Sequence, residues 1–155
     1  MPYEVQVKEV PAQHVAVVRR HTSLATVGQV ITRGFTELGQ AVGMAGVPMV
    51  GPPFVIMDDV IDEDTDGDIE LAFLLAAPFR DSGDVHGEEL PAATVAWTIH
   101  RGPYDEVGPA YHTVTGWIQE HGHEIAGPPR EIYLSDPGKT PDPADYLTEV
   151  QFPIR

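Results

Sequence analysis

The chain contains no cysteine, only two lysines and no long run of apolar residues. The absence of cysteine excludes disulfides, thiolate catalysis, iron–sulfur clusters and cysteine-type zinc sites. Because no stretch of about 18 consecutive apolar residues occurs, we expect no membrane-spanning helix. The N-terminal segment also lacks the basic region and the apolar stretch of a signal peptide, so we expect a cytoplasmic protein with no membrane partner.

Basic residues are scarce as well. The chain has 9 lysines and arginines against 24 aspartates and glutamates, a formal net charge of −15 at pH 7. DNA, RNA and anionic membranes require positive surfaces, so we expect no direct nucleic-acid binding. The negative field favours a cationic partner, although acidity also serves solubility. With 42% hydrophobic residues, the 155 positions suffice for one domain, which we expect to span residues 1–155.

The sequence repeats itself. The segment Glu9-Val10-Pro11-Ala12 resembles Glu89-Leu90-Pro91-Ala92, 80 positions later. Further along, Gly51-Pro52-Pro53 recurs as Gly127-Pro128-Pro129, 76 positions later. Because the spacing stays nearly constant through turn residues and apolar positions, an internal duplication is indicated, with repeats at about 1–78 and 79–155.

Each repeat predicts a strand, a helix and two further strands. Short β-branched and apolar runs predict the strands at residues 15–18, 54–57 and 69–75, and again at 95–99, 131–134 and 147–152. Apolar residues at helical spacing predict the helices, which carry Val27, Ile31, Leu38 and Val42, and then Val107, Tyr111, Val114 and Ile118. Two more β segments are expected at 3–8 and around Val85.

These elements favour an α+β fold. We expect two pseudo-twofold-related βαββ repeats side by side, with an antiparallel sheet and the helices on one face. A single repeat cannot bury both a sheet face and a helix stripe, whereas two repeats can, and a groove between them is a natural ligand pocket.

An acidic loop between two predicted strands resembles the start of a calcium-binding loop. Asp62, Asp64, Asp66 and Gly67 give the pattern D-x-D-x-D-G, but Phe73 stands where the bidentate glutamate is required. The segment that follows also predicts a strand rather than a helix. We therefore expect a solvated loop. No other spacing indicates a metal or cofactor, since nucleophile-elbow and phosphate-loop motifs are missing.

An ordered set of segments carries a family resemblance. These are the opening from Tyr3 to Gln13, then Leu90-Pro91, the run from Trp97 to Tyr104, Tyr111 with Trp117-Ile118, Glu131-Ile132-Tyr133-Leu134 and Leu147–Ile154. In this order the chain resembles the GyrI-like small-molecule-binding domain, the effector-binding domain of AraC- and MerR-type regulators. The resemblance implies that an amphipathic, often cationic or aromatic compound binds between the repeats, near aromatic residues and an acidic residue of the last strand. No helix-turn-helix pattern accompanies these segments, so we expect no DNA regulation by this chain alone.

Glu149 is the acidic candidate. Strand alternation places Thr148, Val150 and Phe152 under the helices and Glu149 on the opposite face, toward the expected groove. A carboxylate there requires a cation or a donor, or else a raised pKa. Glu70 holds the matching position in the first repeat and is the second acidic candidate.

Tyr133 is the aromatic candidate that we expect beside Glu149, where its ring would form a cation–π surface. The other aromatic candidates for ligand contact are Tyr104, Trp97, Trp117 and Phe54. For Trp97 and Trp117 the sequence leaves core packing and pocket lining equally open.

Three functions follow from this interpretation. The first is the binding of a hydrophobic, cationic or aromatic small molecule for sensing, sequestration or protection. The second is a hydrolase of strained electrophilic toxins such as cyclopropane-containing compounds, with Glu149 and Tyr133 as catalytic residues. The third is a gyrase-inhibitor-like interaction with a protein partner. The sequence does not identify the ligand.

Overall fold

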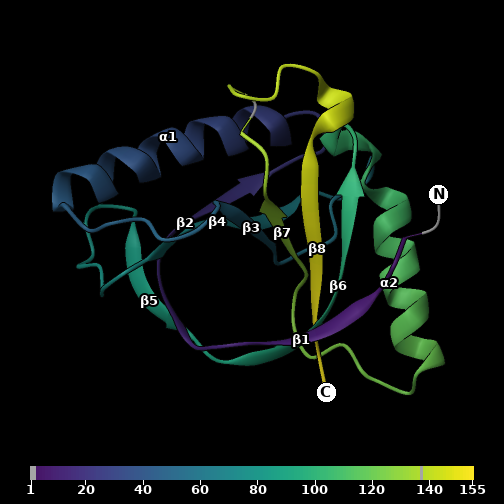
Figure 1. Cartoon of the computed structure of the whole chain (residues 1–155). Helices are drawn as coiled ribbons and strands as arrows, with labels where there is room; N and C mark the ends of the chain where they lie inside the picture. The colour runs from purple at the N-terminus through teal and green to yellow at the C-terminus, as the bar shows by residue number, and fades with distance from the viewer. Residues whose placement is uncertain (1–2, 137) are drawn as a thin grey trace. The chain divides into compact units, whose positions relative to one another are not determined.

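The computed structural model describes residues 3–136 and 138–155. The chain divides into two compact units: unit 1 combines the segment ending at Pro11 with Ala92–Arg155, and unit 2 is Ala12–Pro91. Each unit contains a four-stranded antiparallel sheet and one long helix (Figure 1). This confirms the predicted α+β fold and its two βαββ repeats. Among the described residues, no helix is long and apolar enough to cross a membrane.

Unit 2 contains the first helix. Its elements are β2 (Gln13–Thr22), α1 (Val27–Ala45), β3 (Phe54–Met57), β4 (Gly67–Leu75) and β5 (His86–Leu90). The strand order is β3-β4-β2-β5. Helix α1 packs on β2 and β4.

Unit 1 contains the second helix. Its elements are β1 (Gln6–Val10), β6 (Ala93–Arg101), the 3-10 turn η1 (Tyr104–Glu106), α2 (Gly108–Glu120), β7 (Arg130–Tyr133), the 3-10 turn η2 (Pro143–Asp145) and β8 (Leu147–Ile154). The strand order is β1-β6-β8-β7. Helix α2 packs on β6 and β8, as Figure 1 also shows.

The two sequence repeats exchange their edge strands. Strand β1 precedes β2 in the chain but pairs with β6, where Val10 lies opposite Ala93. Strand β5 precedes β6 but pairs with β2, where Leu90 lies opposite Gln13. Each unit therefore contains an edge strand from the other sequence repeat, and the repeats at about 1–78 and 79–155 differ from the compact units.

The strand registers repeat with the spacing that the sequence shows. Val15 on β2 lies opposite Leu74, and Val95 on β6, 80 positions later, lies opposite Pro153, 79 positions after Leu74. A left-handed glycine follows each helix: Gly46, with φ 71°, is the C-cap of α1, and Gly122, with φ 72°, comes directly after the α2 C-cap His121. The duplication is therefore a property of the backbone as well as of the sequence.

The core of unit 1 lies between α2 and one face of its sheet. Its buried members are Ala96, Ala110, Val114, Ile118, Val150, Phe152 and Ile154. In unit 2, a Cβ added to Gly34 of α1 would lie 2.7 Å from Leu71 Cδ2, so Leu71 points at the helix. Because side chains alternate along a strand, Glu149 and Glu70 point away from the helix of their own unit.

Candidate functional site

All five tyrosines of the chain lie in unit 1, and we call Tyr3, Tyr104, Tyr111, Tyr133 and Tyr146 the tyrosine cluster. The ring of Tyr104 lies 5.2 Å from the ring of Tyr133 and 4.9 Å from that of Tyr146, measured between centroids. The hydroxyl groups of Tyr111 and Tyr133 both donate hydrogen bonds to Glu131. Two members of the cluster thus contact the Glu131 carboxylate, and Tyr104 and Tyr146 extend the aromatic group from Tyr133.

Glu131 is a buried carboxylate, with only 5% of its surface exposed. The Tyr111 hydroxyl lies 2.5 Å from Glu131 Oε2, and the Tyr133 hydroxyl lies 3.2 Å from Oε1. No lysine or arginine forms an ion pair with Glu131 within residues 3–136 and 138–155. Burial raises the pKa of Glu131, and the hydrogen bonds from the two tyrosines oppose that rise. A nearby imidazole, that of His100, also lowers the pKa of Glu131. This carboxyl group therefore lacks a lysine or arginine counter-ion.

The β7–β8 register positions Glu131 and Tyr133 under α2. Glu131 lies opposite Val150, and Tyr133 lies opposite Thr148, so all four side chains share the helix-facing side of the sheet. Tyr111 reaches the same carboxylate from the first half of α2. Burial and the Glu131 charge raise the pKa of Tyr111, which keeps its hydroxyl protonated as a donor.

A tight turn positions Tyr104 and Tyr146. Gly102 adopts φ 135°, a conformation that few other residues tolerate, and its N–H donates to the Tyr146 carbonyl at 2.8 Å. Pro103 follows and leads directly into η1, which begins with Tyr104. The sequence Arg-Gly-Pro-Tyr therefore stacks the two tyrosine rings.

His100 lies on the same face of the sheet and is only 3% exposed. Its Nε2 lies 3.1 Å from the Pro103 carbonyl, which can only accept, so Nε2 carries the proton. Its Nδ1 lies 2.8 Å from the Tyr3 hydroxyl, within hydrogen-bond distance. Tyr3 is thus held against His100, on the helix-facing side of the unit 1 sheet.

Glu149 lies on the opposite face of the unit 1 sheet. It lies opposite Ile99 and Ile132, so the predicted position of Tyr133 beside Glu149 is wrong. The reason is the pairing of β7 with β8. It places Ile132 on the same sheet face as Glu149 and Tyr133 on the other face. Glu149 already has a counter-ion, the Lys8 ammonium at 2.8 Å.

Trp97 and Trp117 have different surroundings. Trp97 on β6 lies opposite Gln151, on the face of Glu149. Trp117 packs against the unit 1 core, and its ring is stacked with those of His121 and His123 at centroid distances of 4.1 and 5.7 Å. Trp97 is thus a neighbour of the Glu149 carboxylate, whereas Trp117 belongs to the end of α2.

Phe54 and Glu70 lie in unit 2, on the sheet face that points away from α1. Phe54 is buried opposite Ala72, and Glu70 is half-buried opposite Arg19 and Ile56. Burial, followed by a contact with the Asp58 carboxyl, raises the pKa of Glu70 to about 7. Neither residue contributes to the tyrosine cluster.

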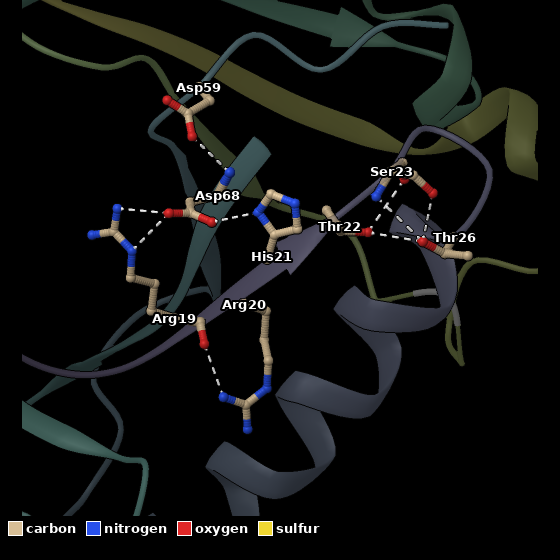
Figure 2. Close-up of polar contacts among 8 residues, drawn as sticks. All are labelled: Arg19, Arg20, His21, Thr22, Ser23, Thr26, Asp59 and Asp68. Atoms are coloured by element: carbon tan, nitrogen blue, oxygen red, sulfur yellow. Dashed lines mark hydrogen bonds and ion pairs between the residues drawn. The ribbon is translucent and has the colours of Figure 1, made fainter. Parts of the chain in front are cut away.

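Arg19 and His21 on β2 bind Asp68 at the start of β4, and Asp68 in turn contacts Asp59 at the beginning of the acidic loop (Figure 2). Arg19 Nη2 lies 3.0 Å from Asp68 Oδ2, and His21 Nδ1 lies 2.9 Å from Asp68 Oδ1. The Asp68 N–H donates to Asp59 at 2.8 Å, and the Asp64 N–H donates to Asp62 at 2.9 Å. The predicted strand after the loop is β4, and no three His, Asp or Glu side chains among the described residues could hold a metal ion.

The sequence indicated Tyr133 and Tyr104 but not the carboxylate that they surround. Glu131, Tyr111, Tyr146, His100 and Tyr3 were missed as site residues. The signal was the i, i+2 spacing of Glu131 and Tyr133 on one short strand, which places both on one face. The arrangement can bind a positive charge, since a desolvated carboxylate and aromatic faces both attract cations.

Structures of known proteins share this fold. The C-terminal domain of EcmrR is 25% identical, with a TM-score of 0.88 over 100% of this chain and 99% of that domain. EcmrR in its DNA complex is 26% identical, with a TM-score of 0.87, and this chain spans 57% of its length.

Two more distant structures share the fold alone. SAV2435 bound to tetraphenylphosphonium is 14% identical, with a TM-score of 0.64 over 100% of this chain and 94% of that one. A hydrolase from Listeria innocua is 16% identical, with a TM-score of 0.71 over 98% and 92%.

No curated protein sequence matches the chain. The model of the GyrI-like small molecule binding domain family, in contrast, matches residues 3–155. Since that match covers nearly every residue, the chain belongs to the GyrI-like small molecule binding domain family.

Proposed function

We propose that unit 1 binds an amphipathic organic cation with aromatic groups, at Glu131 and the tyrosine cluster. The observation that carries this proposal is the buried Glu131 carboxylate, which is hydrogen-bonded by Tyr111 and Tyr133 and forms no ion pair with a lysine or arginine among the described residues. A buried carboxylate is costly without a counter-charge, so a bound cation would lower its free energy. The surrounding rings add cation–π attraction.

The structures of related proteins support this ligand class. SAV2435, with the same fold, was solved with tetraphenylphosphonium, an aromatic cation. EcmrR has the equivalent domain at its C-terminus and was solved in a complex with DNA. We therefore propose that ligand binding by this chain serves sensing or sequestration of such compounds.

Calorimetric titration of Glu131→Gln tests the proposal. The amide keeps the shape of the side chain and removes its charge. Affinity for tetraphenylphosphonium should fall about 10- to 100-fold, because a charge-assisted contact is lost. Affinity for triphenylphosphine oxide, a neutral ligand of similar shape, should change by less than about threefold, since no charge is involved.

Glu149→Gln is the matched control, since both glutamates are buried on β7 or β8 of unit 1. If Glu131 is the ligand acid, this variant should bind tetraphenylphosphonium like the wild type. Loss of binding in Glu149→Gln with retention in Glu131→Gln would move the site to Glu149, as the sequence had suggested. Equal loss of cation and neutral ligand would make the effect structural.

Hydrolysis is the second candidate function. The observation that favours it is Glu131, whose pKa burial raises, so that its carboxyl group is suited to giving or taking a proton, while Tyr111 holds it by a 2.5 Å hydrogen bond. The sequence assigned this role to Glu149 and Tyr133, and the geometry favours Glu131 instead. Turnover of a cyclopropane-containing electrophile, lost in Glu131→Gln with binding retained, would establish it.

A further inference from the structure

Unit 1 contains a second buried carboxylate, Glu149, on the sheet face opposite to Glu131. Glu149 is 8% exposed and accepts a hydrogen bond from Gln151 Nε2 at 2.5 Å. It also accepts a hydrogen bond from the Lys8 ammonium, which lies 2.8 Å from the same oxygen, Oε2. This carboxylate thus differs from Glu131, because it already has a cation.

Trp97 lies against the same ammonium. The Lys8 Nζ is 4.4 Å from the centroid of the Trp97 ring. The Trp97 Nε1 atom is buried and has no hydrogen-bond acceptor within the described part of the chain. The ammonium therefore receives an ion pair and a cation–π contact, while a neighbouring donor is left unsatisfied.

We propose that Glu149, Gln151 and Trp97 form a cation-binding site that Lys8 occupies as an intramolecular ligand, and that primary amines from solution compete with Lys8 for it. The contacts of the Lys8 ammonium are those that an amine ligand requires: a carboxylate at hydrogen-bond distance and an aromatic face. In the absence of an external amine, the Lys8 ammonium therefore fills the site.

Access to the site is through Lys8. Its side chain is 39% exposed, against 10% for the side chain of Glu149, so the ammonium lies on the solvent side of the carboxylate. Lys8 belongs to the edge strand β1, and its long side chain can swing into solvent without breaking a backbone hydrogen bond. An external amine can therefore replace it.

Comparison with unit 2 shows that the fold does not require this arrangement. Glu70 corresponds to Glu149, but the positions of Lys8, Trp97 and Gln151 hold Glu88, Val17 and Ala72. The same arrangement of strands therefore forms in unit 2 without a lysine, a tryptophan or a glutamine at these positions. Their presence together in unit 1 points to a ligand site rather than to a structural necessity.

The Trp97 Nε1 group lacks a hydrogen-bond acceptor within the described part of the chain, which favours a ligand that carries an acceptor as well as an ammonium group. Lys8 offers no acceptor, whereas an amino alcohol has an oxygen two carbons from its ammonium group. Such a ligand can satisfy the buried indole N–H while its ammonium pairs with Glu149. We therefore expect ethanolamine to bind more tightly than propylamine.

Thermal unfolding of Lys8→Ala tests the site, since this variant removes the internal ligand. At an amine concentration about five times Kd, the melting temperature should rise by about 2–4 °C, and ethanolamine should act at lower concentration than propylamine. Propanol is the neutral control and should have no such effect. An equal rise with propanol, or in Lys8→Ala/Glu149→Gln, would overturn the proposal.

The Trp97 indole N–H resonance provides a second measurement, on Lys8→Gln and on the wild type. The chain has two tryptophans, so Trp117→Phe assigns the two indole signals. Ethanolamine should shift the Trp97 signal in both proteins, with the wild type requiring at least about tenfold more amine because Lys8 competes. Absence of any shift would overturn the proposal. The response should persist in Glu131→Gln, so failure at the Glu131 site leaves this result unaffected.

Discussion

Lys8 and Glu88 occupy matching positions on the edge strands of the two units and carry opposite charges. Lys8 lies opposite Val95, and Glu88 lies opposite Val15. Lys8 neutralises Glu149, whereas Glu88 adds negative charge near Glu70. The two units share one backbone fold, but the edge strand places a positive charge beside Glu149 in unit 1 and a negative charge near Glu70 in unit 2.

Glu70 should make the stability of the protein depend on pH. Burial, the Asp58 carboxyl and Glu88 raise its pKa from 4.5 to about 7, against the attraction of Arg19. Because the folded state binds this proton more tightly, the stabilisation is complete below pH 4.5 and is lost as the pH rises through about 7. Glu70→Gln should therefore raise the free energy of unfolding at pH 8 by about 1 kcal/mol, after discounting for solvent screening, and have little effect at pH 4.5. Urea unfolding at both pH values measures the difference.

The exposed Glu63 supplies the control for this experiment. Glu63→Gln removes the same charge from the acidic loop and should leave the pH dependence of stability unchanged. A gain of the same size in both variants would mean that relief of net charge, rather than Glu70 itself, causes the effect.

Removing the Tyr111 hydroxyl should expose the cost of the buried Glu131 carboxylate. Tyr111→Phe deletes the 2.5 Å donor and leaves Tyr133 as the hydrogen-bond partner that the structure describes for Glu131. We expect a loss of about 1–3 kcal/mol in the free energy of unfolding at pH 8, with a smaller loss once Glu131 is protonated. In a Glu131→Gln background the same substitution should cost less. An equal cost in both backgrounds, measured by denaturant unfolding, would show that the hydroxyl does not act through Glu131.

Gly34 is a packing requirement of unit 2. A Cβ there would lie 2.7 Å from Leu71 Cδ2, and Leu71 is fully buried. Gly34→Ala should therefore destabilise the protein by about 1–2 kcal/mol, despite the better helix propensity of alanine. Leu71→Val should relieve the clash, as the matching unit 1 residues Val114 and Val150 suggest.

Gly43 is the matched control on the same helix, because an added Cβ there meets nothing within 4 Å. Gly43→Ala should stabilise the protein by up to about 1 kcal/mol. Thermal melts of both variants compare the two glycines. Stabilisation by Gly34→Ala as well would contradict the clash.

The chain alone should not bind DNA. Its net charge of −15 repels phosphates, and nonspecific binding depends on lysine and arginine contacts. EcmrR was solved with DNA, but this chain spans only 57% of it. A mobility-shift titration against random duplex at low salt should show no complex at micromolar protein. A complex that weakens steeply with added salt would refute this expectation.

The fold could be predicted from the sequence because the duplication shows each turn and each apolar pattern twice. The Gly-Pro-Pro turns and the apolar spacings each occur twice, and the predicted strand 54–57 coincides with β3. The exchange of β1 and β5 could not be predicted, because pairing between distant strands leaves no local pattern. Edge strands also show only a weak alternation of apolar and polar residues, because one edge of each strand faces solvent.

The site was predicted only in part, because the sequence does not reveal how β7 pairs with β8. Strand parity placed Glu149 opposite the helix face correctly, and it also placed Glu131 and Tyr133 on one common face. Parity does not say which face of β7 joins which face of β8. A shift of one residue would have put Tyr133 beside Glu149, and the structure places Ile132 there instead.

The exchanged edge strand also dictates an order of events during synthesis. Unit 2 is one continuous segment, Ala12–Pro91, and all of its strands have been made before β6 is complete. Strand β1, although made first, waits for β6 before it can pair. We therefore expect unit 2 to fold on the emerging chain first and unit 1 to close last. Glu131 and Glu149 both lie in unit 1, so a ligand at either would meet the nascent protein at its final step and could act as a folding aid as well as a signal.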